Sequence, residues 1–339
     1  MVWACRNLYN RRDSGFNAEG HLHMKALVFD SSLQVVEMPV PVPGPGEALI
    51  RVLAAGICRT DSEIKRGYMK YRGVLGHEFV GVVEKASNTY LVGKRVVGEI
   101  NCVCGRCVYC KMEMSRHCVN RTVLGIQERP GAFAEYTTLP ETNLHLVPDG
   151  VHEDVAVFTE PLAAAFRIVE QLSILADDRI VVLGDGKLGQ LVAQTLWLYS
   201  KNIVCVGRHR WKLDLLSRLG IATALNTDTL EGRADVVVEA TGTPAGLQRA
   251  LALVRPEGTV VLKTTCAEGF QMDAVGAVVN EVRILGSRCG PFRPALEALA
   301  MGTIETRPMV SERYPLGDAL RAMSRAEEPD VMKVILHMW

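Results

Sequence analysis

Apolar and polar residues follow two different patterns along the chain. Between residues 25 and 150, β-branched runs of four or five residues alternate with Gly/Pro turns, and Pro39–Gly46, with four prolines and two glycines, must be a loop. This pattern predicts a β-rich region. Its expected strands are Lys25–Phe29, Leu49–Val52, Phe79–Val83, Arg95–Val97 and Ala134–Thr138.

From about residue 155 strand-like runs alternate with segments long enough to be helices. Such alternation predicts βαβ units and a parallel sheet. The expected strands are Ile180–Leu183, Ile203–Val206, Val236–Glu239, Thr259–Leu262 and Ile284–Leu285, and the expected helices are Leu188–Ser200, Trp211–Leu219 and Pro244–Val254. After about residue 290 we expect a helix over Pro294–Met301 and a closing strand over Met332–His337.

Composition narrows the class of protein. A chain of 339 residues suggests two domains. Lys+Arg and Asp+Glu both number 38, so the net charge is zero, which argues against nucleic-acid binding as the main activity. The longest apolar runs fall far short of the ~18–20 residues that span a bilayer. We therefore expect neither a nucleic-acid nor a membrane partner.

Residues 1–23 differ from the rest of the chain. They contain no apolar stretch of the length found in secretory signals, and Asp13 and Glu19 argue against an organelle transit peptide. We expect this segment to be a poorly ordered extension. A cytoplasmic location is the prediction, with import into an organelle through residues 1–23 left open.

The glycine-rich segment Gly184–Gly189, with the sequence GDGKLG, follows an expected strand and opens an expected helix. In that context Gly184 allows a tight turn, Gly186 lets the backbone approach a pyrophosphate, and Gly189 permits close helix–strand packing. The diphosphate would lie on the free amides of the helix start, which Lys187 and Leu188 provide. The alternative is an ordinary glycine-rich turn, which the following βαβ units make improbable.

The end of the second expected strand carries no acidic residue. An acid there would bind the ribose hydroxyls of NAD, but this chain has Gly207, Arg208, His209 and Arg210. A small residue followed by cations suits a 2′-phosphate, so the sequence favours NADP(H). The alternative is NAD(H), with these cations on the solvated surface.

Further cofactor contacts are expected at other strand ends, where the cleft-facing edge of a parallel sheet lies. The candidates are Thr241, Thr264, Thr265 and Arg288. Each of them is as readily an ordinary loop residue.

Five of the ten cysteines lie between residues 102 and 118. Cys104, Cys107, Cys110 and Cys118 have the spacing of four thiolates around one tetrahedral Zn²⁺, which leaves no open position and predicts a structural site. Disulfides suit a short secreted scaffold better than this long α/β chain, and an iron–sulfur cluster is not needed for hydride chemistry. Cys102 is a spare thiol beside the site.

A second constellation carries a family resemblance. Cys58 or His77 alone would be a buried thiol or a satisfied histidine, but together with the four-cysteine segment and the glycine motif the chain resembles the zinc-dependent medium-chain dehydrogenases. The resemblance covers residues 24–339 and includes the Glu-Pro-Leu element of the polyol, sorbitol, glucose and threonine dehydrogenase branch. The matching segments are Gly56–Asp61, Gly76–Glu78, Cys104–Cys118, Thr159–Leu162 and Gly184–Gly189.

The resemblance implies an α/β fold of two domains with the active site between them. A GroES-like β-barrel catalytic domain would take residues 24–155 and 290–339 and carry the structural zinc lobe at about 99–120. A Rossmann domain, a doubly wound parallel sheet, would take residues 156–289.

The same resemblance implies the residues of the catalytic site. Cys58, His77 and Glu78 would bind a catalytic zinc, with Glu160 as a further or exchanging ligand. Thr60 falls where the family places its first proton-relay group. Two further residues bear on this site: Asp61 would orient His77, and Glu63 stands where many alcohol dehydrogenases have a histidine, which leaves the rest of the relay open.

The predicted function is hydride transfer between a secondary alcohol, of polyol, sugar or hydroxy-amino acid type, and a nicotinamide cofactor. Two zinc ions per chain and a homodimer or homotetramer are expected. One alternative is a zinc-free quinone or enone reductase of the same fold, which would lack the cysteine lobe and the Cys58/His77 pair. Another is a non-catalytic dinucleotide-binding module, which would have lost the metal ligands.

Overall fold

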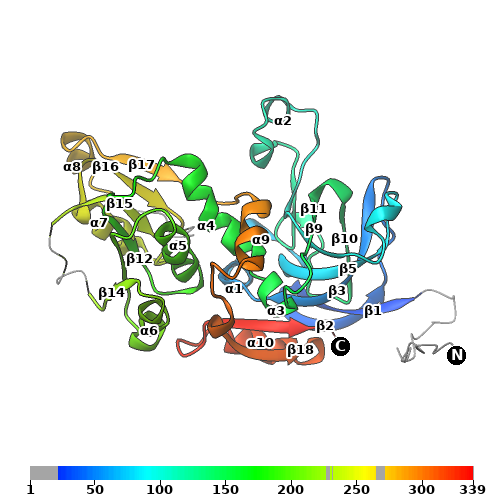
Figure 1. Cartoon of the computed structure of the whole chain (residues 1–339). Coiled ribbons are helices and arrows are strands. Elements are labelled where there is room, and N and C mark those ends of the chain that lie inside the picture. Colours follow the sequence, from blue (N-terminus) through cyan, green and yellow to red (C-terminus); the bar gives the residue numbers. More distant parts are fainter. Residues whose placement is uncertain (1–21, 227–229, 231, 265–271, 339) are drawn as a thin grey trace, which may run out of the picture.

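The computed structural model describes residues 22–226, 230, 232–264 and 272–338. Two sheet systems lie side by side, and helices fill the space between them (Figure 1). The yellow and green half contains a parallel sheet, and the blue, cyan and red half contains a barrel-like sheet with a protruding lobe (Figure 1).

The parallel sheet has the strand order β14-β13-β12-β15-β16-β17. Its strands are β12 (Ile180–Leu183), β13 (Ile203–Val206), β14 (Ala222–Ala224), β15 (Ala234–Glu239), β16 (Val254–Leu262) and β17 (Arg283–Gly286). The helices are α5 (Lys187–Trp197), α6 (Arg210–Arg218), α7 (Pro244–Leu253) and α8 (Ala274–Val279). The order reverses between β12 and β15, so the crevice for a dinucleotide is at the carboxyl ends of these two strands.

The predicted alternation of strands and helices is confirmed here, although β15 and β16 begin earlier than predicted and β14 and α8 were not predicted. β12 and β13 have the predicted bounds, and every residue of β12 is buried. Strands buried on both faces are near-continuous apolar runs, which is the pattern of this stretch.

The larger, mostly antiparallel system has the order β11-β6-β5-β3-β19-β18, with β10 also paired to β3 and a parallel pair between β18 and β19. Its strands are β3 (Glu47–Gly56), β5 (Glu78–Lys85), β6 (Arg95–Gly98), β10 (Tyr136–Pro140), β11 (Leu144–Leu146), β18 (Val310–Pro315) and β19 (Lys333–His337). The last strand pairs antiparallel with the central β3, so the carboxyl-terminal segment returns to the β-rich half. Helix α10 (Ala319–Arg325) connects β18 with β19.

A small sheet of order β2-β1-β4 lies beside the barrel. It consists of β1 (His23–Asp30), β2 (Ser32–Pro39) and β4 (Gly73–Val74). The strand expected over Lys25–Phe29 starts two residues earlier, at His23, and the carbonyl of Leu22 accepts a hydrogen bond from the backbone N–H of Val40. The last two residues of the expected extension therefore belong to this hairpin, while residues 1–21 lie outside the described residues.

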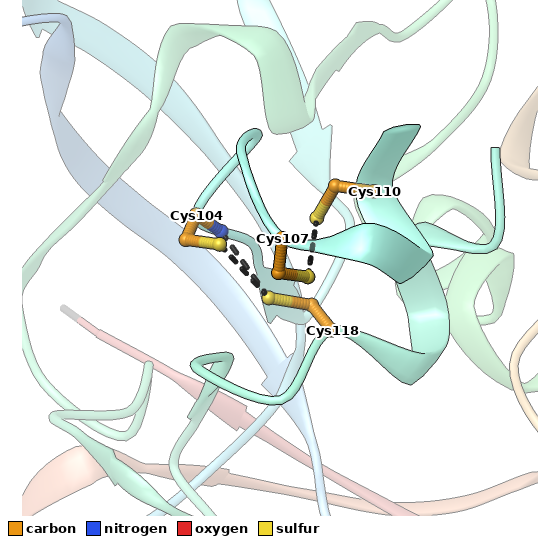
Figure 2. Close-up of side chains that lie close together, drawn as sticks. All are labelled: Cys104, Cys107, Cys110 and Cys118. Carbon is orange, nitrogen blue, oxygen red and sulfur yellow. Dashed lines mark hydrogen bonds between the residues drawn. The ribbon is translucent and has the colours of Figure 1, made fainter. Parts of the chain in front are cut away.

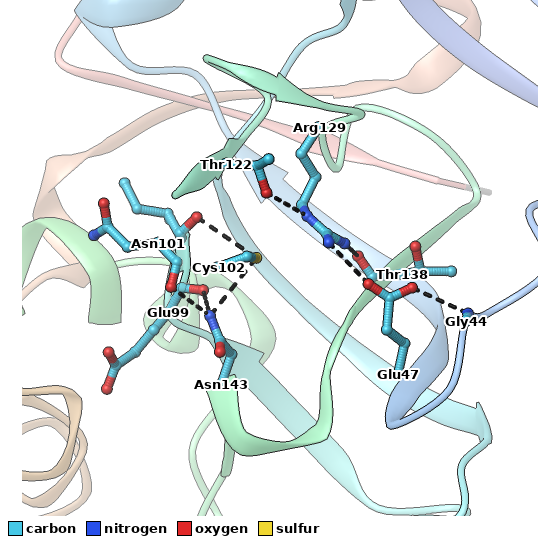
Figure 3. Close-up of polar contacts among 10 residues, drawn as sticks. Gly44, Glu47, Glu99, Asn101, Cys102, Thr122, Arg129, Thr138 and Asn143 are labelled. Atoms are coloured by element: carbon cyan, nitrogen blue, oxygen red, sulfur yellow. Dashed lines mark hydrogen bonds and ion pairs between the residues drawn. The ribbon is translucent and has the colours of Figure 1, made fainter. Parts of the chain in front are cut away.

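The lobe extends from the barrel between β6 and β10 (Figure 1). It contains β7 (Asn101–Cys102), α2 (Val108–Lys111), β8 (Thr122–Leu124) and β9 (Glu128–Arg129). Two polar networks hold its base (Figure 3). Asn143 Nδ2 donates to the carbonyls of Glu99 (2.7 Å) and Asn101 (3.0 Å), and Arg129 Nη2 forms an ion pair of 2.8 Å with Glu47.

Three helices join the two halves: α1 (Arg59–Lys65), α4 (Thr159–Gln171) and α9 (Phe292–Ala300). The short α3 (Glu153–Ala156) precedes α4. One buried apolar cluster runs from Val80 of β5 through Leu162 of α4 to Val182 of β12. Because a shared core resists relative motion, the barrel and the parallel sheet are held in a fixed arrangement near α4. Among the described residues, no helix is both long enough and apolar enough to cross a bilayer.

Candidate active site

The glycine-rich turn between β12 and α5 has the geometry that a dinucleotide needs. Gly184 has φ of +116°, a conformation that favours glycine. A Cβ on Gly189 would lie 1.9 Å from the carbonyl oxygen of Gly184, so the helix and the strand pack too closely for any side chain. A Cβ on Gly186 would meet nothing within 4 Å, so the backbone there faces open space in which a diphosphate can approach.

Lys187 links this turn to the barrel. Its Nζ donates a hydrogen bond of 3.0 Å to the carbonyl oxygen of Ile57, the residue before Cys58. Burial lowers the pKa of Lys187 below its usual value. The side chain thus lies inside the contact between the two halves, whereas Leu188 packs on the apolar cluster beside it.

Two of the threonines named from the sequence meet at the turn after β15. The backbone N–H of Gly242 donates to Thr264 Oγ1 at 2.9 Å, and Thr241 Oγ1 donates to the buried Glu239 at 2.6 Å. A Cβ on Gly242 would lie 3.1 Å from Arg59 Nη1, so the guanidinium of Arg59 crosses from the barrel to this turn. Arg59 is a cation at the cofactor crevice that the sequence analysis quoted but did not assign.

The other expected cofactor residues are spread more widely. Arg208 is exposed and follows the buried Gly207 at the end of β13. The Arg288 guanidinium donates to the backbone carbonyl of Arg116, so it faces the lobe rather than the glycine-rich turn. Thr265 lies outside the described residues.

Cys58, His77 and Glu78 form a cluster whose ligand atoms all lie within 4.8 Å of one another. Cys58 follows β3 and caps α1, and His77 and Glu78 stand at the start of the neighbouring β5, whose pairing brings Glu78 opposite Gly56. His77 and Glu78 are buried, and Cys58 is half-buried. Three ligands of types that bind zinc therefore converge from two adjacent strand ends.

The buried groups around this cluster fit a metal ion. Asp61 Oδ2 accepts from the backbone N–H of Cys58 at 2.8 Å, and Asp61 Oδ1 lies 3.4 Å from His77 Nδ1. That contact directs Nδ1 to the carboxylate and leaves Nε2 for a cation, the arrangement typical of metal-bound histidines. Burial lowers the pKa of His77, but Asp61 and Cys58 outweigh it and raise that pKa well above its usual value. A local excess of negative charge favours a cation here.

Glu78 has a partner that the sequence analysis missed. The ammonium of Lys333, in β19, forms an ion pair with Glu78 Oε2, and both side chains are almost fully buried. The only signal in the sequence is a lysine inside the apolar run Val331–Leu336. Such a lysine needs a carboxylate partner, because an unpaired buried charge is strongly destabilising.

Glu160 lies near this cluster but outside the group of three ligands. Burial raises the pKa of Glu160 to about 7, while His77, Lys333 and Lys263 act in the opposite direction. It also lines a small pocket, together with Glu99, Asn101, Arg116, Cys289 and Phe292 among others.

Thr60 lies beside Cys58. Its Oγ1 is 3.7 Å from Cys58 Sγ, so the hydroxyl faces the ligand cluster. Glu63, one turn further along α1, forms an ion pair of 2.8 Å with Arg66 instead.

The second cluster contains Cys104, Cys107, Cys110 and Cys118, and all four thiols point toward one centre (Figure 2). The Sγ atoms of Cys104 and Cys118 are 3.5 Å apart, as are those of Cys107 and Cys110. These separations exceed a disulfide bond of about 2.05 Å. They approach the ~3.8 Å edge of a tetrahedron with zinc–sulfur bonds of about 2.3 Å. None of the cysteines within the described ranges forms a disulfide.

The electrostatics of the four thiols also suit a cation. Backbone N–H groups of Arg106 and Cys107 lower the pKa of Cys104 to about 6, whereas burial and the neighbouring thiols raise that of Cys110 to about 12. Thiols that share one small volume cannot all ionise without a compensating charge. A divalent cation at the centre would supply it.

A dinucleotide-type sheet, joined by buried helices to a barrel with two groups of metal ligands, defines a metal-dependent dehydrogenase. Residues 44–149 match the alcohol dehydrogenase GroES-like domain, and residues 188–304 match the zinc-binding dehydrogenase domain. The chain belongs to the zinc-binding dehydrogenases, which are NAD(P)-dependent enzymes that oxidise secondary alcohols.

Similarity extends over nearly the whole chain. Sorbitol dehydrogenase of Halalkalibacterium halodurans is 28% identical over 92% of this chain and 99% of its own length. L-threonine 3-dehydrogenase of Saccharopolyspora erythraea is 28% identical over 92% of this chain and 98% of its own length. The structure of a Sinorhizobium meliloti 1021 protein, described as a zinc-binding dehydrogenase, was solved with NADP bound. It superposes with a TM-score of 0.86 at 28% identity and covers 93% of this chain and 99% of its own chain.

Proposed function

We propose that this enzyme transfers hydride between a secondary alcohol of polyol, sugar or hydroxy-amino acid type and a nicotinamide cofactor at a catalytic zinc. The convergence of Cys58, His77 and Glu78 next to the cofactor turn carries this proposal, because it brings metal ligands and the dinucleotide crevice to one place. The similarity to sorbitol and L-threonine dehydrogenases supports the substrate class.

Each residue around the reacting carbon would have a separate task. Zinc held by Cys58, His77 and Glu78, with Glu160 in reserve, would supply Lewis acidity that lowers the pKa of the alcohol. Thr60 would relay the hydroxyl proton, accepting it while passing its own proton on toward solvent, since its hydroxyl lies beside the ligand cluster. Asp61 would hold the His77 ring, and Lys333 would balance the charge of Glu78.

The protein also positions the cofactor. The amides at the start of α5 would bind the diphosphate, and the guanidinium of Arg59 would add a positive charge nearby. Thr241 and Thr264 would form part of the wall of the crevice. The hydrogen bond from Lys187 to Ile57 would fix the distance between the dinucleotide and the metal ligands. Arg288 could contact the cofactor only if its side chain turned away from the lobe, which its guanidinium contacts in this structure.

We infer two zinc ions per chain, one at the catalytic cluster and one among the four cysteines.

We also infer a preference for NADP(H), which the exposed guanidinium of Arg208 supports. Among the described residues it forms no ion pair, and it stands at the end of β13 where a 2′-phosphate would lie. One charge-assisted contact of about 1.5–3 kcal/mol would give roughly a 10–150-fold preference.

The test is a panel of secondary alcohols, polyols, sugars and hydroxy-amino acids, followed by nicotinamide absorbance with each cofactor, together with metal analysis. The expected result is turnover of one of these classes, two zinc ions per chain and a higher kcat/KM with NADP⁺. Full activity on a quinone or enone in metal-free protein would support the reductase alternative instead. A higher kcat/KM with NAD⁺ would contradict the cofactor preference alone.

We further propose a homodimer built across β17. This strand is an edge of the parallel sheet, and the neighbouring α8 exposes Val275, Val278 and Val279, each at 74% or more. A strand edge beside an apolar helix favours pairing with a second copy of the chain.

A further inference from the structure

The acid that the chain lacks after the second strand of the parallel sheet is supplied from another segment. Asp185 belongs to the glycine-rich turn after β12, yet its Oδ2 accepts hydrogen bonds from the backbone N–H groups of Arg208 (2.8 Å) and His209 (2.7 Å). Its carboxylate therefore lies at the end of β13. Dinucleotide-binding sheets usually place an acidic side chain there, on the second strand itself.

Packing fixes the carboxylate in this place. The Asp185 side chain is only 10% exposed, and His209 Nδ1 lies 3.0 Å from Oδ2. A Cβ on Gly207 would be 2.4 Å from both Cβ and Oδ2 of Asp185, so residue 207 must be glycine for the carboxylate to fit. Asp185 in the glycine-rich turn and Gly207 after β13 therefore depend on each other: the carboxylate fits only because residue 207 has no side chain.

The position of Asp185 bears directly on the adenosine ribose of the cofactor. Two backbone N–H groups that could hold a phosphate are already bonded to Asp185, and its negative charge would repel one. Within the described ranges its second oxygen, Oδ1, has only the 3.3 Å contact with His209 Nδ1, and it retains capacity to accept from a ribose hydroxyl. The exposed guanidinium of Arg208, on the same backbone segment, would attract a phosphate and so act in the opposite sense.

We infer that Asp185 is a specificity-determining residue that opposes the 2′-phosphate of NADP and favours the free ribose hydroxyls of NAD. The inference rests on the proposed cofactor site. The choice between the cofactors is then a balance between attraction by Arg208 and repulsion by Asp185. The absence of an acid in residues 207–210 is compensated in space, and the sequence alone overstates the preference for NADP(H).

The decisive variant is Asp185→Asn, because an amide oxygen can still accept from the two backbone N–H groups while the charge is removed. Affinities for 2′,5′-ADP and for ADP, measured by calorimetry, report the 2′-phosphate without catalysis or metal. We expect the affinity for 2′,5′-ADP relative to ADP to rise by on the order of ten-fold or more. The gain should shrink at high salt, since screening weakens charge repulsion. The kcat/KM ratio of NADP⁺ to NAD⁺ should rise in parallel.

A matched control is Asp177→Asn, which removes the same charge from an exposed site before β12, at the opposite end of the strand. Its affinity ratio should equal that of the unmodified enzyme. Asp185→Ser serves as a second variant should the amide disturb the turn, with unfolding temperatures measured for all. An unchanged ratio, or equal weakening of both ligands, in folded Asp185 variants would overturn the inference.

These outcomes are separate from the test of the proposed function. That test measures the cofactor preference of the unmodified enzyme, whereas this one measures the change caused by removing a single charge. An enzyme that prefers NAD⁺ and gains affinity for 2′,5′-ADP in Asp185→Asn would support the role of Asp185 and contradict only the proposed preference.

Discussion

His77 offers one imidazole nitrogen to Asp61 and the other to the centre of the ligand cluster. We expect His77→Ala or Cys58→Ala to abolish turnover and to remove the catalytic metal, because each deletes one of the three converging ligands. Metal analysis and initial rates measure this outcome. Dinucleotide affinity should stay within about two-fold, since the glycine-rich turn lies on the other sheet.

The matched control for these variants is His152→Gln. His152 has a side chain 64% exposed and lies in a loop before α3, so the substitution should leave rates and metal content unchanged. Turnover by metal-depleted His77→Ala protein at the rate of the unmodified enzyme would contradict the assignment of this site.

The second prediction concerns the role of the Thr60 hydroxyl in proton transfer. If this hydroxyl relays the proton of the alcohol toward solvent, Thr60→Ala should lower kcat by roughly 10²–10⁴-fold. Thr60→Ser restores a hydroxyl at the same distance from Cys58 Sγ, so it should recover most of the rate. An unchanged kcat in Thr60→Ala would exclude this residue from the proton path.

At individual positions, the sequence predicts those residues whose chemistry is written in a contiguous motif. The four lobe cysteines come together in this way, whereas Cys58 and His77 were assigned through the family resemblance. Lys333 and Asp185 were missed, because each acts on a partner that is distant in sequence or carried by another strand. Only the three-dimensional pairing of β19 with β3, and of β12 with β13, places these charges.

The cysteine lobe has no substantial core of its own, and its short elements are α2 and three strands of two or three residues. We therefore expect folding there to depend on the cross-link that a bound metal would supply. Cys107→Ser should therefore release about one zinc per chain and lower the unfolding temperature by roughly 5 °C or more. Calorimetry and metal analysis on the same sample check both effects.

Cys102→Ser is the control for that variant. Cys102 is a buried thiol beside the lobe, and it contacts Asn143 Nδ2 at 3.8 Å rather than the cysteine cluster. The change should leave both metal ions in place. Iron in the lobe of well-loaded protein would contradict the zinc assignment.

Helices and strands were predictable where a pattern repeats. The buried strands of the parallel sheet have near-continuous apolar runs, and those predictions are confirmed. β2 was missed because neither of its faces is fully buried, so its apolar residues do not mark one side of the strand. α4 was recognised only as a short motif, because its length follows from packing against α5 and α9.

At the scale of the whole molecule, we expect the sheet edge at β17 to form the interface between two copies of the enzyme. On the available side β17 pairs with no other strand among the described residues, and Val278 on the adjoining α8 is 76% exposed. Two copies related by a two-fold axis would pair their β17 strands antiparallel and cover both valine clusters, since such interfaces use the same surface on each copy. α8 and β17 belong to the half of the molecule that contains the parallel sheet (Figure 1), so the paired surface lies outside the barrel.

Val278→Glu should therefore shift the enzyme toward a species of 37.2 kDa, because a charge buried at an apolar interface is costly. Light scattering coupled to size-exclusion chromatography measures the mass. Val42→Glu is the control: Val42 is 90% exposed on the proline-rich loop of the barrel, far from β17 in sequence and on the other half of the molecule. An unmodified enzyme of 37.2 kDa, or a Val278→Glu variant with the unmodified oligomeric mass, would contradict assembly through this edge.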